Sequence, residues 1–425
     1  MAVTDSILLT EEVRKKIEEL QEVDILVGIP SYNNARTIPH VVRAVHAGLA
    51  KYYPKAKCVL VNSDGGSNDG TPDLVSQTDI GNLETILVDH PVYLINKIVT
   101  PYHGIPGKGS AFRTIFKLAE KLNAKACCVV DSDLRSITPE WIELLLDPVI
   151  DKGFDYVAPL YSRHKFDGTI TNSIVYPMTR AMYGKQIRQP IGGEFGFSGK
   201  LARHYLTKNV WESDVARYGI DIWMTTTAIG DGFNVCQSYL GAKIHDAKDP
   251  GSDLSAMFTQ VISSLFTFLE LYQKIWREIK SSEQVPTFGF RFEVGLEPVN
   301  VNIERMINAY KLGIDSLLPF LDRVLLDDEL AQLKELAQQD QSRFHFPDDL
   351  WVKIVFRYAI AYHKRVWAVQ QLMKSMIPLY MGRTASFVIS NMNTSADEVE
   401  NNIELLCQSF EKQKPLLIKY WENYK

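Results

Sequence analysis

Hydrophobic residues in the first 245 positions alternate between short apolar runs and longer stretches with helical spacing. The runs DILVGIP (24–30), AKCVLVNS (56–63) and ACCVVDSD (126–133) have the length and β-branched content of buried strands. Helical patterns cover about 37–52 and 110–122. Strands that alternate with helices predict an α/β fold with a parallel, doubly wound sheet. In such a sheet, ligands bind outside the carboxyl ends of the strands.

The pattern changes after about residue 253. Apolar residues recur at three-and-four spacing from Leu254 to Leu269, which predicts a helix. Similar patterns recur over 303–337, 348–372 and 396–423. The segment 281–300 is predicted to be a loop or a short hairpin. We therefore expect an α/β domain over 1–250 and a helical C-terminal domain or extension over 251–425. The aromatic content of the second favours core and dimer contacts over a cofactor site, so a homodimer is expected.

Composition narrows the class of protein. The 425 residues are 46% hydrophobic, and a formal net charge of −5 gives no basic footprint for nucleic acid. The five cysteines lack metal-ligand spacing, and the adjacent Cys127 and Cys128 are typical of small strand residues in a reducing compartment. The N-terminus has no signal-peptide pattern, and the chain has no run of about 18 apolar residues. A soluble cytoplasmic protein without a transmembrane segment is expected.

Asp131 and Asp133 follow one of the predicted strands and carry like charges two positions apart. Such a pair is stabilised by a positive charge between its members. An Asp-x-Asp at a strand end suits a divalent cation bound to a nucleotide diphosphate, with one carboxylate ligating the metal and the other binding the metal through water or holding a sugar hydroxyl. The same triplet also occurs in loops as a turn or cap, so a structural role stays open.

Two glycine-containing loops lie near other strand ends. In HGIPGKGSAF (103–112), glycines flank Lys108 just before a helix, so its ammonium and the backbone amides could meet phosphate oxygens. The spacing is not that of a P-loop, and a solvated lysine is the alternative. In NSDGGSNDGT, Asp64 could accept a hydrogen bond from a base or ribose. Alternatively, Gly65 and Gly66 form a tight turn there.

Three further motifs contain groups suited to ligand binding. In RQPIGGEFGFSG, Gly192 and Gly193 allow close approach of the backbone to a ligand, and Glu194 adds a carboxylate. Asp221 lies inside an apolar run, where an unpaired charge would be costly to bury. His245 follows a short strand pattern and could ligate a metal, although a lone histidine is more often structural.

The order of these motifs resembles that of a known enzyme family. PSYNN, NSDGG, GKG, DSDL, DGTIT, RQPIGGEFGFSG, YGIDI and LGAKIHD with LSAM look like the retaining glucosyl-3-phosphoglycerate synthases and related hexosyl-glycerate synthases. These are glycosyltransferases with the GT-A fold, a Rossmann-like nucleotide-sugar-binding fold. The resemblance covers roughly 22–270. It implies that the chain transfers a hexose, foremost glucose, from a UDP- or GDP-sugar to a small glycerate-type carboxylate, with Mg²⁺ or Mn²⁺ as cofactor.

The resemblance also implies roles for individual residues. A donor-binding set comprises Pro30, Ser31, Tyr32, Asn34, Asp64, Lys108, Asp131, Gln189, Gly192, Gly193 and Glu194. Asp133 and His245 are the implied metal ligands. Asp133, Lys108 and Asp221 are the implied catalytic residues, with Asp221 in place of a family glutamate that faces the donor sugar. The chemistry implied is retention of the anomeric configuration, by front-face attack with the leaving diphosphate as base.

Departures from the family pattern fall on the acceptor and on the base. Gly168, Thr169 and Thr171 match the acceptor loop, but Thr169 replaces an arginine, and Ala247 replaces an asparagine that follows the metal histidine. The loss of both phosphate contacts costs several kcal/mol of binding, at roughly 1.5–3 kcal/mol per charged hydrogen bond. Glycerate is therefore favoured as acceptor, while the basic residues at 163–165 could restore a grip on 3-phosphoglycerate. Asn34 replaces an acidic residue near the base, so purine donors stay open.

Two other functions are consistent with such a sheet. Sugar nucleotidyltransferases open their first strand into a glycine-rich loop with arginine and lysine, and IPSYNNARTI has no such glycines. A catalytically idle sugar-nucleotide-binding protein would be expected to lose its metal ligands, yet Asp131, Asp133 and His245 are all present. A glycosyltransferase is therefore the leading hypothesis.

Overall fold

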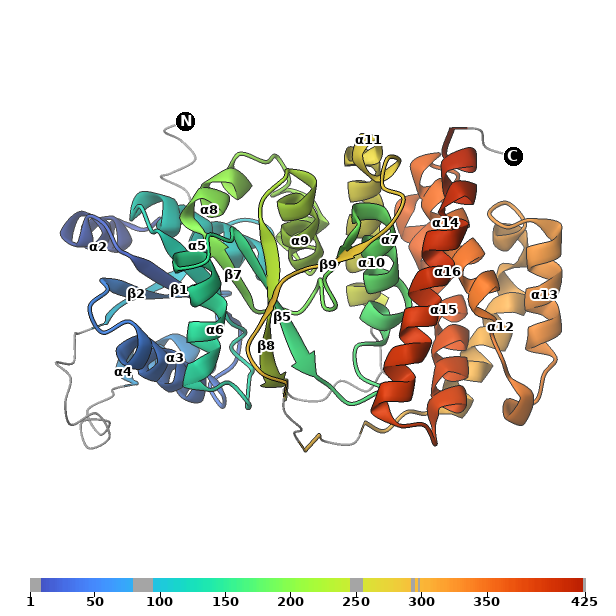
Figure 1. Ribbon diagram of the computed structural model, residues 1–425, viewed down its shortest axis with the longest axis horizontal. Coiled ribbons are helices and arrows are strands. Elements are labelled where there is room, and N and C mark those ends of the chain that lie inside the picture. Colours follow the sequence, from blue (N-terminus) through green and yellow to red (C-terminus); the bar gives the residue numbers. More distant parts are fainter. Residues whose placement is uncertain (1–8, 79–94, 245–254, 292–294, 297–298, 423–425) are drawn as a thin grey trace. The chain divides into compact units, whose positions relative to one another are not determined.

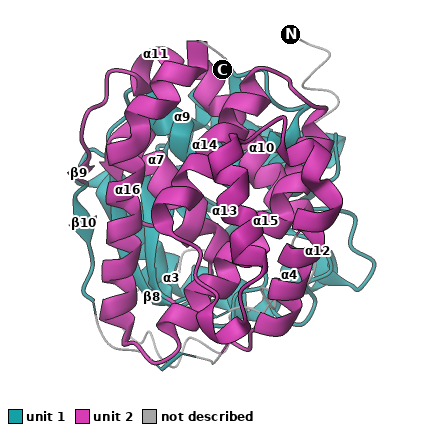
Figure 2. Ribbon diagram, turned by 90° about the vertical axis from the view of Figure 1, so that its right-hand side faces the viewer, with its two compact units in different colours: residues 1–162, 189–246, 285–296 teal, residues 163–188, 247–284, 297–425 magenta. Residues whose placement is uncertain are grey.

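The computed structural model shows a chain that folds into two compact units (Figure 1). It describes residues 9–78, 95–244, 255–291, 295–296 and 299–422. Unit 1 comprises 1–162, 189–246 and 285–296, and unit 2 comprises 163–188, 247–284 and 297–425 (Figure 2). The units interleave along the sequence. Segment 163–188 therefore groups with the C-terminal helices and 285–296 with the sheet, whereas the sequence suggested one division at residue 250.

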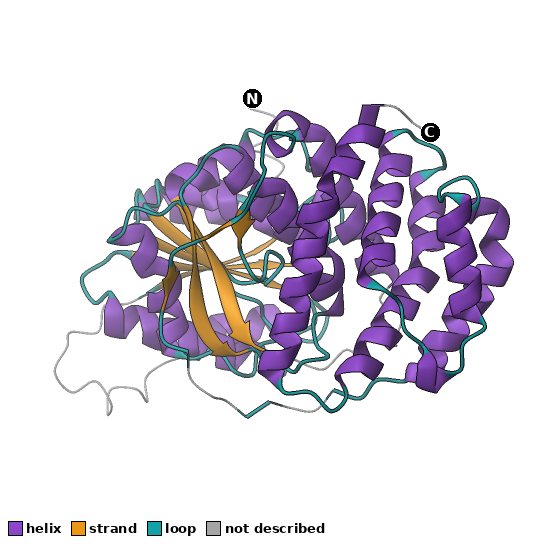
Figure 3. Ribbon diagram, turned by 45° about the vertical axis from the view of Figure 1, so that its right-hand side comes forward, coloured by secondary structure: helices purple, strands orange, loops and turns teal. Residues whose placement is uncertain are grey.

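Unit 1 is built around an eight-stranded sheet (Figure 3). Its strands are β1 (Ile25–Ser31), β2 (Cys58–Asp64), β3 (Asn96–Pro101), β4 (Ala126–Val129), β5 (Tyr156–Ser162), β7 (Phe195–Ser198), β8 (Val235–Ala242) and β10 (Thr287–Phe288). Their order is β10-β8-β5-β7-β4-β1-β2-β3, and β7 alone among them pairs antiparallel with its neighbours. The predicted α/β fold with helices around a mostly parallel sheet is confirmed.

Helices cover both faces of this sheet. They are α2 (Glu11–Leu20), α3 (Ile38–Tyr52), α4 (Thr71–Gln77), α5 (Lys108–Lys121), α6 (Pro139–Ile150), α8 (Gly199–Leu206), the 3₁₀ turn η2 (Asp214–Ala216) and α9 (Ile220–Gly230). Ile25, Val27 and Ile29 of β1 share one core with α3 and α6. On the opposite face a Cβ at Gly28 would lie 2.6 Å from Ile115 of α5. Side chains alternate between the faces of a strand, so β1 is apolar on both sides.

Strand direction brings the polar motifs to one edge of the sheet. Ser31 at the end of β1 pairs with Asp64 at the end of β2. Because β7 is antiparallel, its first residue rather than its last lies at this edge, where Phe195 pairs with Val129. Glu194, which precedes β7, is thereby brought beside the chain that continues from β4 into the Asp-x-Asp triplet.

Unit 2 is helical. Its elements are the π-helix η1 (Thr171–Val175), α7 (Tyr176–Tyr183), α10 (Ser255–Leu271), α11 (Gln273–Trp276), α12 (Ile303–Leu321), α13 (Asp327–Ala337), the 3₁₀ turn η3 (Gln341–Arg343), α14 (Asp348–His363), α15 (Val369–Asn391) and α16 (Ala396–Glu422). The predicted helical patterns fall on α10, α12 to α14 and α16. Most of α15 was missed. It buries residues on every side, from Leu372 and Met373 to Arg383 and Thr384, so it has no amphipathic stripe.

Within the described part of 281–300, the two short strands do not form a hairpin with each other. The segment contains β9 (Glu283–Gln284), which pairs with β6 (Lys185–Gln186) in unit 2, and β10, which pairs with β8 in unit 1. The two short strands therefore pair with different partners, both in parallel orientation. A hairpin would need them to pair with each other in antiparallel orientation.

The five cysteines are free and buried, and Cys127 and Cys128 lie in β4 as predicted. Among the described residues, no helix is both long and apolar enough to cross a membrane.

Candidate active site

A half-buried lysine lies at the start of α5 and binds two carboxylates. Lys108 Nζ lies 2.8 Å from Asp131 Oδ1, beyond the end of β4, and 3.2 Å from Asp221 Oδ1, in the first turn of α9. The helix begins two residues earlier than the sequence predicted, so Lys108 is its first residue rather than part of the preceding loop. The three predicted residues Lys108, Asp131 and Asp221 are thus brought together, and the buried charge of Asp221 has a partner.

A second lysine, which the motifs did not single out, completes the cluster. Lys243 follows β8 and is 5% exposed. Its Nζ lies 3.2 Å from Asp131 Oδ2 and 2.8 Å from Oε2 of Glu194, whose side chain is fully buried. It also donates to the Gly192 carbonyl at 2.8 Å, and Tyr161 donates to Glu194. Two lysines therefore hold three carboxylates, with Asp131 between both ammonium groups.

The glycine-rich loop before β7 fits closely around this cluster. Gly193 has φ +97°, and a Cβ there would lie 2.4 Å from Asp131 Oδ2 and 3.0 Å from Lys243 Nζ. A Cβ at Gly192 would lie 2.1 Å from Pro159 Cγ. Both positions require glycine, because any side chain would displace the charged groups or the backbone. These glycines were predicted to let the backbone approach a ligand closely. In the structure, the backbone at Gly193 approaches the protein's own Asp131.

Burial and charge act against each other within the cluster. Burial lowers the pKa of Lys108, but Asp131 and Asp221 outweigh it and raise that pKa above its ordinary value. Burial would raise the pKa of Asp131, yet Lys108 and Lys243 hold it well below its usual range. For Glu194 burial prevails and raises the pKa to about 7. Asp131 and Lys108 thus stay charged at neutral pH, while Glu194 is close to its titration point.

The residues predicted to surround the base lie at the ends of β1, β2 and β3. Tyr32 is 62% exposed. A Cβ at Gly65 would lie 3.0 Å from Tyr32 Cδ2 and 3.0 Å from Tyr102 Oη, so the glycine separates two aromatic side chains. Tyr102 accepts a hydrogen bond from Gly107 N at 3.0 Å, beside Lys108. An exposed ring of this kind can stack on a nucleobase.

Other predicted donor residues make structural hydrogen bonds. Asp64 accepts from Ser67 N at 2.9 Å and from Ser31 Oγ at 3.2 Å, so the tight-turn reading holds for it. Asn34 Oδ1 accepts from Tyr32 N at 2.9 Å and from Ser132 Oγ at 2.8 Å. These bonds fix the loop after β1 to the Asp-x-Asp triplet. Pro30 pairs with Ser63 inside the sheet.

Gln189 lies in a position suited to a sugar contact. The residue is 7% exposed, and its Nε2 donates to Tyr161 O at 3.2 Å. Within the described part of the chain, its Oε1 has no hydrogen-bond partner. A buried acceptor without a partner costs about 1–3 kcal/mol, which a ligand hydroxyl would offset.

The predicted metal ligands lie partly outside the described residues. Asp133 is half-buried, and in the described ranges its carboxylate takes part in no hydrogen bond or ion pair, unlike that of Asp131. His245 lies outside the described residues. Among the described residues, no three carboxylate, imidazole or thiolate groups come together as a metal-binding set. Asp133 therefore fits a cation that takes its remaining ligands from His245, water or a bound diphosphate.

Comparison with known proteins supports the resemblance. No protein-family model matches the chain. A curated glucosyl-3-phosphoglycerate synthase from Petrotoga mobilis is 25% identical over 275 residues, which cover 61% of this chain and 78% of that protein. The chain is similar to glucosyl-3-phosphoglycerate synthase. The resemblance inferred from the motifs is thereby confirmed.

Solved structures of glucosyl-3-phosphoglycerate synthase from Mycobacterium tuberculosis also match. One, in complex with Mn²⁺, uridine diphosphate and glucosyl-3-phosphoglycerate, has a TM-score of 0.44 and 22% identity and covers 59% of this chain and 83% of that chain. Another, with Mn²⁺, UDP-glucose and phosphoglyceric acid, has a TM-score of 0.43 and 20% identity and covers 62% of this chain and 84% of that chain.

The residues matched to the acceptor loop of glucosyl-3-phosphoglycerate synthases belong to unit 2. Gly168 has φ +67°, and Thr169 is buried, with its hydroxyl 2.5 Å from that of Tyr380. Thr171 begins η1 and is buried. The structure thus places Gly168, Thr169 and Thr171 together in unit 2. Ala247, the second departure from the family pattern, lies outside the described residues.

The upstream bases proposed as substitutes for the missing arginine are bound within unit 2. Arg163 Nη1 lies 3.6 Å from Asp167. Lys165 Nζ donates to the carbonyls of Asn391, Met392 and Thr394 at 2.8–2.9 Å. Lys165 therefore satisfies carbonyl groups at the C-terminal end of α15, where a cation is stabilising.

Replacing Lys243 by methionine should destabilise the protein. Glu194 would lose its closest cation while fully buried, and breaking such a pair costs about 3–5 kcal/mol. We expect a loss of this order in the free energy of unfolding from urea denaturation at pH 8. The double variant Lys243→Met/Glu194→Leu should recover part of it. A change below about 0.5 kcal/mol in the single variant would show that Lys243 is not required to stabilise Glu194.

The raised pKa of Glu194 predicts a pH dependence of stability. Between pH 4.5 and 7 the folded protein holds a proton on Glu194 that the unfolded chain has released, so this group's contribution to stability falls as pH rises through that window. Glu194→Gln removes this titration. The thermal unfolding midpoint of the wild type, relative to that of Glu194→Gln, should therefore decrease from pH 4.5 to 7. Parallel curves for the two proteins would contradict the assignment.

Proposed function

We propose that the protein is a metal-dependent retaining glycosyltransferase that moves a hexose, foremost glucose, from a nucleoside-diphosphate sugar to a small glycerate-type acceptor. The observation that carries the proposal is the cluster of Lys108, Lys243, Asp131, Glu194 and Asp221 at the strand ends, next to an Asp133 carboxylate suited to a cation. The motif order and the similarity to a curated glucosyl-3-phosphoglycerate synthase support the same function.

The nucleotide would lie along the ends of β1, β2 and β3. Tyr32 would stack on the base, with Ser31, Asn34 and Asp64 holding the loops around it. The diphosphate would approach the amino end of α5, where backbone amides and Lys108 favour negative charge. Lys108 is already oriented by Asp131 and Asp221, so little ordering is left to occur when the donor binds.

Asp133 and His245 would hold the divalent cation, Mg²⁺ or Mn²⁺. When bound, such an ion supplies charge stabilisation for the departing diphosphate. Lys108 would add a positive charge beside the same group. The hexose would lie between Asp221 and Gln189, whose unpartnered Oε1 could accept a hydrogen bond from a sugar hydroxyl.

The transfer itself exchanges one bond for another at the anomeric carbon. The bond from C1 to the diphosphate oxygen breaks, and a bond from C1 to the acceptor hydroxyl oxygen forms on the same face of the sugar. The hydroxyl proton passes to the leaving diphosphate. Asp221 would face the positive charge that develops on the sugar ring, and this charge is stabilised by a nearby carboxylate.

The acceptor we favour is glycerate. Thr169 and Ala247 replace an arginine and an asparagine that would bind a phosphate, and Arg163 and Lys165 already have partners in unit 2. Transfer to 3-phosphoglycerate or to another sugar or polyol is the alternative. Homodimer formation and a cytoplasmic location stay predictions.

An idle sugar-nucleotide-binding protein is the second candidate function. In such a protein, substitutions at the active-site residues would not impair catalysis, and buried charges without a function are costly to retain. The cluster keeps all five of its charged groups in contact, which favours catalysis.

The test is proton NMR of UDP-glucose and Mg²⁺ with purified protein, with D-glycerate and 3-phosphoglycerate in separate tubes. We expect an α-anomeric product with glycerate. Asp133→Ala should lower the rate by about 100-fold or more, because a ligand of the charge-stabilising cation is lost, without changing the thermal midpoint. Asp73→Ala, at an exposed carboxylate of α4, is the matched control and should keep full activity.

Three outcomes would count against this account. Product with 3-phosphoglycerate alone would contradict the preference for glycerate. Full activity of Asp133→Ala would show that Asp133 is not a ligand of the cation. Absence of transfer from UDP- and GDP-hexoses to either acceptor, with nucleotide binding intact, would favour the idle protein.

A further inference from the structure

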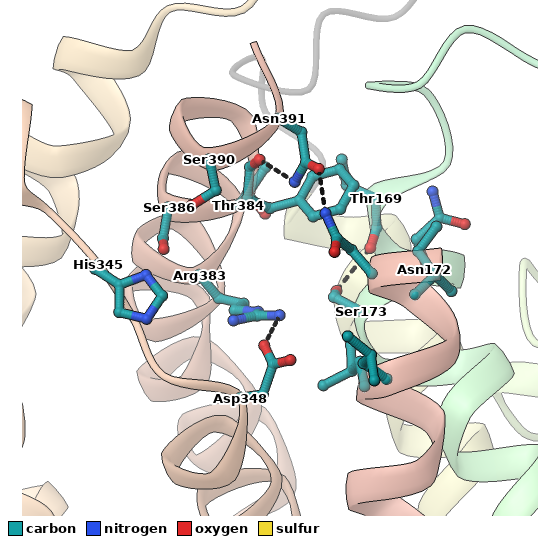
Figure 4. Close-up of a pocket in the computed structure, with 15 residues that line it drawn as sticks. Thr169, Asn172, Ser173, His345, Asp348, Arg383, Thr384, Ser386, Ser390 and Asn391 are labelled. Atoms are coloured by element: carbon teal, nitrogen blue, oxygen red, sulfur yellow. Dashed lines mark hydrogen bonds and ion pairs between the residues drawn. The ribbon is translucent and has the colours of Figure 1, made fainter. Parts of the chain in front are cut away.

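Unit 2 contains a cavity of about 180 Å³ (Figure 4). The described residues that line it include none of the predicted donor-binding set. The cavity is enclosed by residues 169–173 on one side, by α15 and α16, and by the chain that leads into α14. Most of its lining falls between residues 345 and 406, beyond the part of the chain that carries the family resemblance. Apart from Thr169, which the resemblance places in the acceptor loop, its lining residues have no role assigned by the motifs or by the matched proteins.

The walls of the cavity combine an apolar face with separate polar groups. Phe387, Ile403, Leu405 and Leu406 supply apolar surface. The polar lining residues include Thr169, Asn172, Ser173, Asp348, Arg383, Ser390, Asn391 and Asn402. Mostly apolar walls with a few placed polar groups are typical of sites for small organic ligands.

Arg383 is the buried charge of this cavity. The residue is 7% exposed, its Nη2 lies 2.5 Å from Asp348 Oδ1, and its Nη1 donates to the Phe346 carbonyl at 2.7 Å. In Figure 4 the guanidinium of Arg383 and the carboxylate of Asp348 point toward one another. In the described part of the protein, the Nε of Arg383 has no hydrogen-bond acceptor. A ligand oxygen could supply that missing acceptor, since an unpaired buried donor is costly.

The charges of the lining select the class of ligand. Arg383 and Asp348 form one ion pair, so together they contribute no net charge. An anion would gain a bond from Arg383 but would be repelled by Asp348. An uncharged hydroxyl group can accept from Arg383 and also donate to a carboxylate or amide oxygen. The CH groups of a polyol would meet the apolar face formed by Phe387 and the leucines.

The volume limits the size of the ligand. A cavity of about 150 Å³ holds benzene, with six heavy atoms. The 180 Å³ here therefore suits a polyol of three or four carbons, or the end of a larger one. A hexose would fill it and extend through the opening.

We propose that this cavity binds a small uncharged polyol of the size of glycerol or erythritol. Arg383 donates to one hydroxyl, and Asp348 and the amide oxygens accept from others. The same chemistry would serve an acceptor of the transfer reaction or an effector that is not consumed. The proposal stands on the cavity and does not depend on the proposed function.

The experiment is saturation-transfer NMR on the full chain, with titration of glycerol and erythritol to obtain dissociation constants. D-Glycerate and inorganic phosphate are the anionic comparators. Ser390→Trp fills the cavity from an exposed position, so folding should be preserved. Gln371→Trp is the matched control, since it adds the same ring at an exposed position of α15 outside the cavity.

We expect both polyols to bind, with at least tenfold weaker binding in Ser390→Trp and unchanged binding in Gln371→Trp. Binding should persist in Asp133→Ala, because that substitution lies in unit 1; failure of the transfer reaction is thereby distinguished from failure of this site. With UDP-glucose and Mg²⁺, a glycosylated polyol that disappears in Ser390→Trp would identify an acceptor, and binding without product an effector. Tighter binding of either anion, no polyol binding, or equal binding by the two tryptophan variants would overturn the proposal.

Discussion

The position of Asp131 between two ammonium groups is the interaction on which the active-site region of unit 1 depends. Lys108 binds one of its oxygens from the start of α5, and Lys243 binds the other from the end of β8. Each lysine also binds a second buried carboxylate, Asp221 or Glu194. Removing either lysine would leave a carboxylate, Asp221 or Glu194, without its cation, so both lysines are needed to hold the three carboxylates together.

Because of these ion pairs, the two carboxylates of the Asp-x-Asp triplet have different surroundings. Like charges at Asp131 and Asp133 suggested a metal between them, but Asp131 has its counter-charges from the protein itself. Asp133 makes no such ion pair in the described ranges and is the carboxylate that we propose for the cation, although the two residues lie only two positions apart. The antiparallel strand β7 makes this possible, because its first residues bring Glu194 and the glycines to the strand end of β4. A fully parallel sheet would have placed that loop at the opposite edge.

Sequence patterns predicted the secondary-structure elements whose burial leaves a regular pattern within a short stretch of the chain. Apolar runs predicted β1, β2 and β4, and helical spacing predicted α3 and α16, since burial on one or both faces leaves a regular pattern. The motifs also identified Lys108, Asp131, Glu194 and Asp221 as candidate residues. They missed most of α15, which is buried all round. They predicted a loop or a short hairpin at 281–300, where two short strands pair with other segments.

Contacts between distant residues could not be predicted in the same way. Lys243 lies two residues before the singled-out His245, and its spacing alone gives no sign that it binds Asp131 and Glu194. Tyr161 and Tyr102 are ordinary aromatic residues in the sequence and gain a role only from their contacts, Tyr161 from within β5 and Tyr102 from just after β3. Arg383 lies in an apolar helix, where an unexplained buried charge was the one signal that could have directed attention to its cavity.

The central claim is that the strand-end cluster with Asp133 binds a nucleoside diphosphate together with a divalent cation. Calorimetric titration of the wild-type protein with UDP and with GDP, in Mg²⁺ and then in EDTA, tests it most directly. The account predicts that at least one nucleotide binds in Mg²⁺, and at least tenfold more weakly when the metal is removed. Absence of binding for both nucleotides, or equal affinity in EDTA, would contradict it.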